Sequence, residues 1–481
     1  MAKTRAKTTR KRPSKPAAKA PAQVVRVVRA RYDAAQTTHD NARHWAASDA
    51  LSAAAANAKG VREIIKRRAR YETANNGIAH GIVGTLANDI VGTGPRWQIA
   101  GNRDALLPLV RAWQRWSDEI NLADKLRTMR RAQCVDGEAF AVIATNRGLR
   151  SAVQLDVMPI DSDRVTDDTL SFDPTYADGI QYDAFGNPVT YRVLNYHPTE
   201  ASLSPPSEMA TNWPARNVIH LFKADRPGQL RGISELVSTL GLFAELRRYT
   251  LAVLAAAETA ADFAWFLKST SPEIQASDAT PFDTVEIERR MGQVLPAGWD
   301  VSQLKAEQPT TAYSDFRFNL VGEAARPLHM PVNVAMADSS KSSYASSRMD
   351  HIPYERAIRI DRDMIDRRAL DKIAYAWLDE AALIPGLLPA GLPPFSEWDW
   401  KWVWPGFENS DPTKDANATG SRLLQHTTTL RDEYEKDGED WVEQLQQRAQ
   451  EIALMNELGI PMTTQSGAVI GEQQQGAGAN A

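Results

Sequence analysis

The sequence has 481 residues, of which 43% are hydrophobic and 24% are charged, with 56 Lys and Arg against 60 Asp and Glu. Its single cysteine, Cys134, excludes an internal disulfide framework and a cysteine-rich zinc module. The most apolar stretch, 251–267, contains Glu258 and Asp262 and falls short of the ~20 apolar residues of a membrane span. No membrane partner is therefore expected.

Charge is unevenly distributed along the chain. Residues 1–31 contain eleven Lys and Arg and no acid, which leaves 45 bases against 60 acids in the remainder. This composition predicts a basic disordered arm over 1–32 that either contacts nucleic acid or an acidic partner or is simply solvated. The acidic remainder is unsuited to tight binding of DNA phosphates. The Gln/Gly-rich residues 463–481 are predicted to be a disordered tail.

The N-terminal third is predicted to be helical. Polar helical sequence covers 33–72, and 62–98 forms a helix that is stopped by the VGTGP motif. Within it, apolar residues recur every fourth position, at Ile78, Ile82, Leu86 and Ile90. One or two further amphipathic helices are predicted over 104–134.

Strands follow the helices. Alternating apolar residues predict strands in EAFAVIAT, SAVQLDVMPI, PVTYRVLNYH and VIHLF, all within 138–222. The stretch 180–194 reads as a hairpin with Gly186 and Asn187 near its tip. Long helices and short strands then alternate, with helices over 232–262, 312–330 and 348–384, short strands over 263–310, and a charged helical hairpin from 413 to about 459. The fold class is therefore α+β.

A row of tryptophans lies in SEWDWKWVWPGF. Trp398, Trp400, Trp402 and Trp404 occupy alternate positions, so they share one face of a predicted strand. Such a row can stack nucleic-acid bases. Because Asp399, Lys401 and Val403 lie on the other face, packing into a core or a subunit contact is favoured.

No motif for a reaction is found. A P-loop requires Gly-Lys, which the sequence lacks, and the eight histidines form no HExxH or HxH pair. Asp156, Asp161 and Asp163 could hold a hard cation, and the loop around Lys341 superficially resembles Ser-Lys nucleophiles. The stretch RPGQLRGIS (226–234) could bind an anion at a helix N-terminus, but a structural turn is favoured.

Several segments together resemble the lambda-type portal proteins of tailed bacteriophages. The most specific is NVIHLFKADRPGQLRGISEL, which is similar to the family's RPGQ-x-RG-x-S signature, followed at family-like separation by SSYASSR. Weaker similarities lie in ARYETANNGIAHGIVGTLANDIVGTGPRWQ, DGEAFAVI, VQLDVMPIDSDRV and WPGFENSDPTKDANAT. The resemblance covers roughly residues 33–460.

The resemblance implies a structural protein and not an enzyme, with no cofactor. Portal proteins form a ring, with twelve subunits expected, at one capsid vertex, and double-stranded DNA passes through the channel. Implied partners are the terminase large subunit, the major capsid and scaffold proteins and the head-completion or adaptor proteins. The implied location is the virion, after assembly in the host cytoplasm.

The family fold implies a domain layout. Its parts are a wing (33–231), a first stem helix (232–262), a clip (263–311), a second stem helix (312–332), a channel loop (333–347), a wing helix with the Trp strand (348–412) and crown helices (413–462). The DNA-facing loop residues would be Asp338, Ser339, Ser340, Lys341, Ser342, Ser343 and Tyr344, with Lys341 contacting phosphate.

RPGQLRGIS would then be the joint between wing and stem, formed by Arg226, Gly228, Gln229, Arg231, Gly232 and Ser234. Gly228 and Gly232 would adopt unusual backbone angles, and Ser234 would cap the stem helix. Arg226 and Arg231 would bind carboxylates of a neighbouring subunit. The four tryptophans of the row, with Arg348, would pack between subunits.

Two other functions remain open from the residues alone. A Mg²⁺-dependent nucleic-acid-processing enzyme would use Asp156, Asp161 and Asp163 as metal ligands. A DNA-tethered structural adaptor would bind DNA through the basic arm without forming a ring.

Overall fold

The computed structural model describes residues 43–44, 47–99, 103–167, 175–200, 210–262, 266–269, 299–302, 310–389, 394–407 and 412–460. The predicted arm and tail lie outside these residues. The chain divides into two units, Met1–Leu51 and Ser52–Ala481, and the elements below belong to the second. Among the described helices, none has the length and apolar character needed to span a bilayer.

The helical start of this unit consists of α1 (Ala53–Ala56), α2 (Lys59–Asn75) and α3 (Gly77–Val91). The predicted helix over 62–98 is divided because the Asn76 side chain accepts hydrogen bonds from the amides of Ile78 and Ala79 and so caps a new helix. The predicted recurrence of apolar residues at every fourth position is confirmed, since Ile82, Leu86 and Ile90 are buried. The stop at Gly92 is confirmed as well, with φ +54°.

The predicted pair of helices in the next segment is α4 (Arg103–Glu119) and α5 (Leu122–Asp136). Between α3 and α4, β1 (Arg96–Ile99) pairs antiparallel with β11 (Trp400–Val403), which places Trp97 opposite Trp402. Trp97, Trp113 and Trp402 belong to a group of stacked and tilted indoles. This group lies in the main hydrophobic core.

Two small antiparallel sheets follow. The first has the order β3-β2-β8, from Leu155–Ile160, Glu138–Thr145 and Val218–Phe222. The second has the order β4-β5-β6-β7, from Tyr176–Ala177, Ile180–Tyr182, Pro188–Leu194 and Ala210–Pro214. The predicted hairpin is β5–β6, and Gly186 at its tip has φ +82°.

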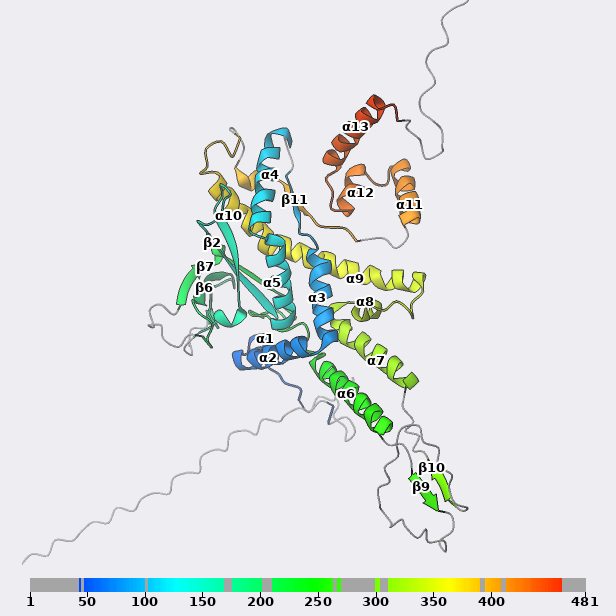
Figure 1. Ribbon diagram of the computed structural model, residues 1–481. Coiled ribbons are helices and arrows are strands. Elements are labelled where there is room, and N and C mark those ends of the chain that lie inside the picture. The colour runs from blue at the N-terminus through cyan, green and yellow to red at the C-terminus, as the bar shows by residue number, and fades with distance from the viewer. Residues whose placement is uncertain are drawn as a thin grey trace, which may run out of the picture. The chain divides into compact units, whose positions relative to one another are not determined.

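The helices α6 (Leu240–Asp262) and α7 (Thr310–Ala325) lie side by side (Figure 1). The start predicted for α6, residue 232, is wrong by eight residues, because 232–239 is held by hydrogen bonds to the end of α5. The predicted second stem helix is also too long. It ends at Ala325, followed by a 3-10 turn (Arg326–Leu328) that contains Pro327 and then by α8 (Val332–Met336). The short strands predicted between α6 and α7 are β9 (Phe266–Ser269) and β10 (Trp299–Ser302).

The long C-terminal helix of the body has three parts: α9 (Tyr344–Ile365), a π-helical turn (Asp366–Leu370) and α10 (Asp371–Ala381). Because α8 and α9 occupy its ends, the loop predicted over 333–347 shrinks to 337–343, and Tyr344 is the first residue of α9. The predicted helical hairpin has three helices, α11 (Pro412–Leu424), α12 (Leu430–Lys436) and α13 (Trp441–Glu457). Left-handed residues, His426 and Gly438, lie between them.

Candidate functional site

The joint between β8 and α6 begins with a turn at Gly228. Gly228 has φ +80°, as predicted, because the left-handed conformation is accessible to glycine at little strain. Gln229 fixes the turn, since its side chain accepts a hydrogen bond from the Asp225 amide (3.0 Å) and donates one to the Arg231 carbonyl (2.9 Å). Arg226 lies exposed in this turn, and its contact with a neighbouring subunit stays a prediction.

Gly232 is required for a different reason from the one predicted. Its backbone is not left-handed, but a Cβ atom on it would lie 2.0 Å from the carbonyl oxygen of Gly137. Conversely, a Cβ on Gly137, which has φ +91°, would lie 2.2 Å from the Ile233 carbonyl carbon. The two glycines therefore let the joint pass directly over the end of α5.

Ser234 does not cap α6, which starts six residues later. Its hydroxyl donates to the Cys134 carbonyl (3.1 Å) and accepts from the Leu236 amide (3.3 Å). The Glu235 amide also donates to Cys134 (3.0 Å). Ser234 thus satisfies a carbonyl at the end of α5 and fixes the turn before α6.

Arg231 forms a buried ion pair within its own chain. Its Nε and Nη2 atoms donate to the two carboxylate oxygens of Glu138, at 2.8 and 2.6 Å, and both side chains are almost fully buried. The Gly232 amide donates to the same carboxylate at 3.1 Å. The prediction that Arg231 binds a neighbour's carboxylate is therefore wrong.

The titration of this pair follows from burial and charge. Burial alone would raise the pKa of Glu138, but the charge and hydrogen bonds of Arg231 hold it well below its usual range. His220 lies 3.3 Å from Glu138, and burial lowers the pKa of this histidine to about 4 despite the carboxylate. At neutral pH the cluster thus contains a charged Arg231, an ionised Glu138 and a neutral His220.

A second buried group ties the joint to α9. Arg130 of α5, whose side chain is 1% exposed, donates to Glu235 (2.8 Å) and to Asp361 (2.9 Å). Lys223 lies 2.7 Å from Asp361 and 3.4 Å from Glu235. Two carboxylates, Glu235 and Asp361, thus each contact the same two cations, Arg130 and Lys223. These contacts link the joint to α5, to α9 and to the residue directly after β8.

The predicted channel loop is docked on α7. Lys341 forms an ion pair with Asp315 and lies 4.9 Å from the ring centre of Phe318, both on α7. Asp338 accepts a hydrogen bond from the Ser340 amide (2.9 Å), and Ser343 caps α9. The loop is thus fixed at both ends, and Lys341 already has an anionic partner.

Of the tryptophan row, Trp400, Trp402 and Trp404 share one face, as predicted, whereas Trp398 lies before β11 and directly after a 3-10 turn. The indoles of Trp400 and Trp402 donate to Asp371 at 2.9 and 3.0 Å, and that of Trp404 donates to Asp366 at 3.0 Å. Trp402 and Trp404 are buried within their own chain, so for these two the prediction of packing between subunits is wrong. For Trp398 and Trp400, which are half-buried, and for Arg348, which is exposed, it stays a prediction.

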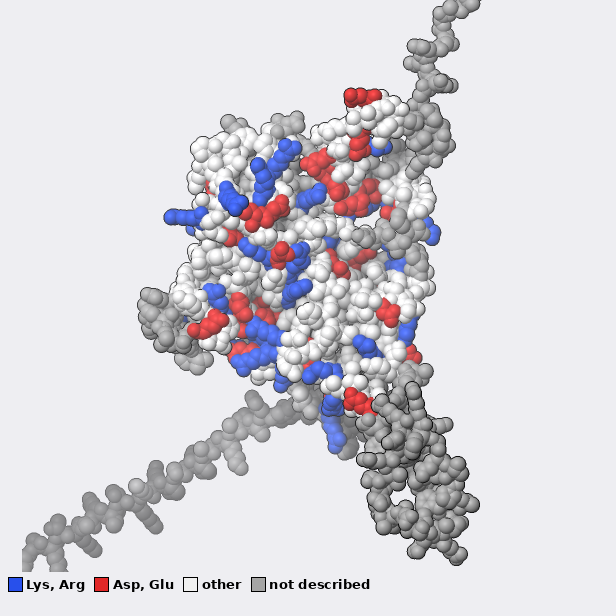
Figure 2. Space-filling model, in the orientation of Figure 1, with Lys and Arg blue, Asp and Glu red and all other residues white. Residues whose placement is uncertain are grey.

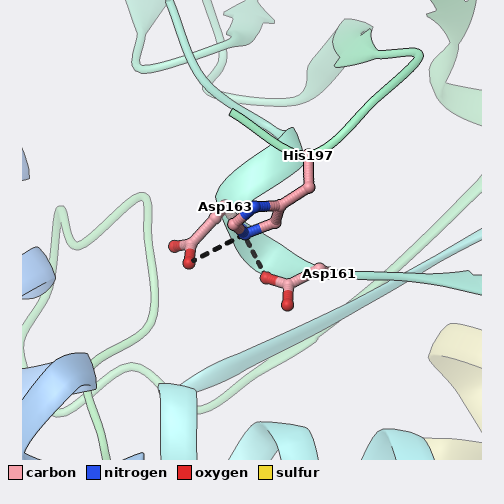
Figure 3. A group of neighbouring side chains, drawn as sticks. All are labelled: Asp161, Asp163 and His197. Atoms are coloured by element: carbon pink, nitrogen blue, oxygen red, sulfur yellow. Dashed lines mark hydrogen bonds and ion pairs between the residues drawn. The ribbon is translucent and has the colours of Figure 1, made fainter. Parts of the chain in front are cut away.

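The three aspartates proposed as metal ligands are not brought together. Asp156 binds Lys125 (2.5 Å) and accepts a hydrogen bond from Asn146 (2.8 Å). Asp161 and Asp163 instead group with His197, with one potential ligand atom from each residue within 4.8 Å of the others (Figure 3).

This second group is already neutralised by cations. Arg70 donates to Asp163 (2.6 Å) and Asp161 (3.0 Å), and Lys66 pairs with Asp163. Although burial opposes it, these cations hold the pKa of Asp163 at about 2. Because the cations take the place that a metal ion would fill, the arrangement is structural.

The sequence could not reveal the partners of the joint. Glu138, Arg130 and Asp361 carry no local signal as site residues, because their contacts join positions 93 to 231 residues apart. Over the face drawn in Figure 2, Lys and Arg are interspersed with Asp and Glu. No broad basic surface is visible on the described residues of that face.

Comparisons with known proteins agree with the resemblance. A family model described as phage portal protein, lambda family, matches residues 38–362. A probable portal protein of Halomonas phage phiHAP-1 is 24% identical over 338 residues, and the match spans 68% of this chain and 64% of that relative's length.

Solved structures are similar at lower identity. One, from the virion of a native gene transfer agent particle, has 11% identity and a TM-score of 0.45. The similar region covers 75% of this chain and 88% of that chain. Another, an HK97 family phage portal protein from Corynebacterium diphtheriae, has 14% identity and a TM-score of 0.28. The similar region covers 64% of this chain and 95% of that chain. Because the family match spans more than half of its residues, the chain belongs to the lambda family of phage portal proteins, which are structural proteins and not enzymes.

Proposed function

We propose that this chain assembles into a closed ring, with twelve subunits expected, that forms the DNA channel at the unique vertex of a phage capsid. The observation that carries the proposal is the family match over 38–362, which contains the joint, the loop and most of α9. In this role the ring receives the terminase large subunit during packaging. It contacts the major capsid and scaffold proteins and later binds head-completion or adaptor proteins.

Exposed apolar surface on α6 supports assembly. Residues 251–258 read LAVLAAAE, and Leu251 and Leu254 are 59% and 55% exposed. On α7, Phe316 is 50% exposed. A helix that is apolar on most of its sides is normally buried, so a second copy of the chain is the proposed cover. Contacts of this head-to-tail kind close into a ring.

The charge of the chain supports the passage of DNA without tight binding. Outside the first 31 residues, 60 acids exceed 45 bases, so phosphate contacts and the counterion release that accompanies them are limited. We place Lys341 beside the DNA path. When DNA is present, the Lys341 ammonium group leaves Asp315 and binds a DNA phosphate instead.

The test is the particle mass of the purified full-length protein, measured by native mass spectrometry with negative-stain images. The expected result is a closed ring near twelve times the chain mass of 53.2 kDa, with a central hole. A monomer or dimer over a range of salt concentrations would contradict the proposal. Tight, salt-sensitive DNA binding without a ring would instead favour the tethered adaptor.

A further inference from the structure

The π-helical turn between α9 and α10 aligns two carboxylates with the tryptophan row. Residues five apart in a regular α-helix point about 140° away from each other, and the wider π turn reduces this angle. Asp366 and Asp371 consequently both accept indole N–H groups from alternate residues of one strand segment. Trp404 is the last of these, and its indole N–H donates to Asp366.

Trp404 lies at the start of the connection to the C-terminal helices α11–α13. A Cβ on Gly406 would lie 2.1 Å from the carbonyl oxygen of Lys436, at the end of α12. Gly438 has φ +78°, and a Cβ on it would lie 3.0 Å from the Cα of Pro405. Residues 404–406 thus lie directly against the end of α12, so the position of Trp404 affects how α12 packs on the body.

Asp366 has no cation bonded to it among the described residues. The cation that acts on it electrostatically is Arg362, whose Nε and Nη2 atoms donate to the carbonyls of Ile90 (2.8 Å) and Asp89 (3.0 Å). The Arg362 guanidinium lies over the rings of Trp404 and Phe407, at 5.4 and 5.0 Å.

Two further acids act on Asp366 from neighbouring positions. Asp363 on α9 and Asp371 on α10 both act on it electrostatically. A cavity of about 820 Å³ separates Asp366 from α11 and α12. The charged groups that line this cavity from α9 and β11 are Arg348, Glu355, Arg359, Arg362, Asp363 and Lys401, and those from α11, α12 and the turn after α12 are Asp415, Arg422, Glu433, Glu435, Lys436 and Asp437.

Many of these groups are already paired with one another. Lys401 binds Glu435, Arg422 binds Glu433 at 3.3 Å, and Lys436 binds Glu433 at 2.6 Å. They therefore offer little compensation to a charge on Asp366. Water entering the cavity is the remaining way to solvate that charge.

We propose that Asp366 and Trp404 form a pH-sensitive clasp, which holds the C-terminal helices against the body while Asp366 is protonated and loosens them when it ionises. A neutral carboxyl group can remain in its half-buried place and still accept the indole hydrogen bond. Ionisation strengthens that bond, but the cost of burying the charge is larger. Hydration of the carboxylate removes this cost, which widens the cavity and draws residues 404–406 away. The clasp is independent of ring formation.

The pH range follows from the environment of Asp366. Burial raises its pKa from the ordinary 3.8 to about 7, and the hydrogen bond from Trp404 offsets only part of this increase. Since the folded pKa lies above the unfolded one, the stability that protonated Asp366 contributes is complete below about pH 4. It is lost as pH rises to about 7.

The test is hydrogen–deuterium exchange of the full-length protein between pH 5.5 and 8.5, corrected for the intrinsic pH dependence of exchange. In the wild type, protection of residues 402–407 and 430–438 should fall about tenfold or more between pH 5.5 and about 7 and should level off above that pH. Asp366→Asn, which mimics the neutral acid, should stay protected at both ends of the range. Asp379→Asn, a matched control at an exposed aspartate of α10, should behave like the wild type.

Either of two results would overturn the clasp: protection in the wild type that is independent of pH, or pH dependence that survives in Asp366→Asn. Trp404→Phe gives a second measurement that does not alter the carboxyl group. Because phenylalanine has no N–H group to donate to Asp366, protection of residues 430–438 should already be low at pH 5.5 and should change less with pH than in the wild type. Protection at pH 5.5 equal to that of the wild type would also count against the proposal.

Discussion

The backbones at Gly232 and Gly137 lie so close together that neither position has room for a Cβ atom. Replacing Gly232 with Ala places a Cβ atom 2.0 Å from the Gly137 carbonyl oxygen, so the joint or the end of α5 must shift. We expect the free energy of unfolding to fall by roughly 3 kcal/mol, measured by urea denaturation. The matched control is Gly241→Ala in α6, where no atom lies within 4 Å, and it should gain up to about 1 kcal/mol. Equal stability of Gly232→Ala and the wild type would show that the contact is not tight.

The ion pair of Arg231 and Glu138 gives a second prediction at the scale of the residue. Glu138→Leu leaves a buried guanidinium without its bidentate partner, and should lower the free energy of unfolding by roughly 3–5 kcal/mol. The double substitution with Arg231→Met removes both charges and should be less destabilised than Glu138→Leu alone. Denaturation of the four proteins in a double-mutant cycle checks this. A double variant that is worse than both single ones would mean that shape, and not charge, dominates here.

Sequence reasoning located the joint but not its chemistry. The spacing of Gly228, Arg231 and Gly232 identified a structural turn, and the turn is there. The acceptor for Arg231 could not be predicted, because Glu138 lies 93 residues away on a strand whose register is set by tertiary pairing. The role of Gly232 was mistaken for the same reason, since close approach to Gly137 leaves no local signal.

At the scale of the element, helices and strands with strong periodicity were predictable and their ends were not. The hairpin β5–β6 and the helix α3 follow directly from residue spacing. The late start of α6 and the division of the long helix at Asp366 depend on contacts with α5 and with the tryptophan row. These contacts form only in the folded chain.

The loop 337–343 provides a prediction at this scale. Its attachment to α7 runs through Lys341, which binds Asp315 and packs against Phe318. Because the pair is exposed, it contributes at most about 1 kcal/mol. Lys341→Ala should therefore raise the rate of subtilisin cleavage within the loop about two- to fivefold, with a smaller difference at high salt. Lys341→Arg keeps the charge and the ring contact and should remain close to the wild type. Unchanged cleavage in Lys341→Ala would show that this side chain does not hold the loop on α7. It would also weaken the proposal that Lys341 exchanges Asp315 for a DNA phosphate.

At the scale of the whole molecule, the proposed ring buries the apolar face of α6, which a single chain leaves exposed. Leu254→Glu places a charge on its exposed apolar face without disturbing the monomer core. The native mass should therefore shift from ring to monomer while the circular dichroism spectrum is kept. Leu383→Glu, at a leucine that is 82% exposed after α10, is the control and should form rings. A ring of normal mass from Leu254→Glu would assign the subunit contact to another surface.

The buried guanidinium of Arg130 also has a consequence for the order of events during synthesis. Its two carboxylate partners, Glu235 and Asp361, lie 105 and 231 residues further along the chain. At ordinary rates of translation, roughly 10 to 50 s pass between the appearance of Arg130 and that of Asp361. Until then the centre of the body holds a charge without its full set of partners. A nascent chain consequently cannot complete this body before α9 has left the ribosome.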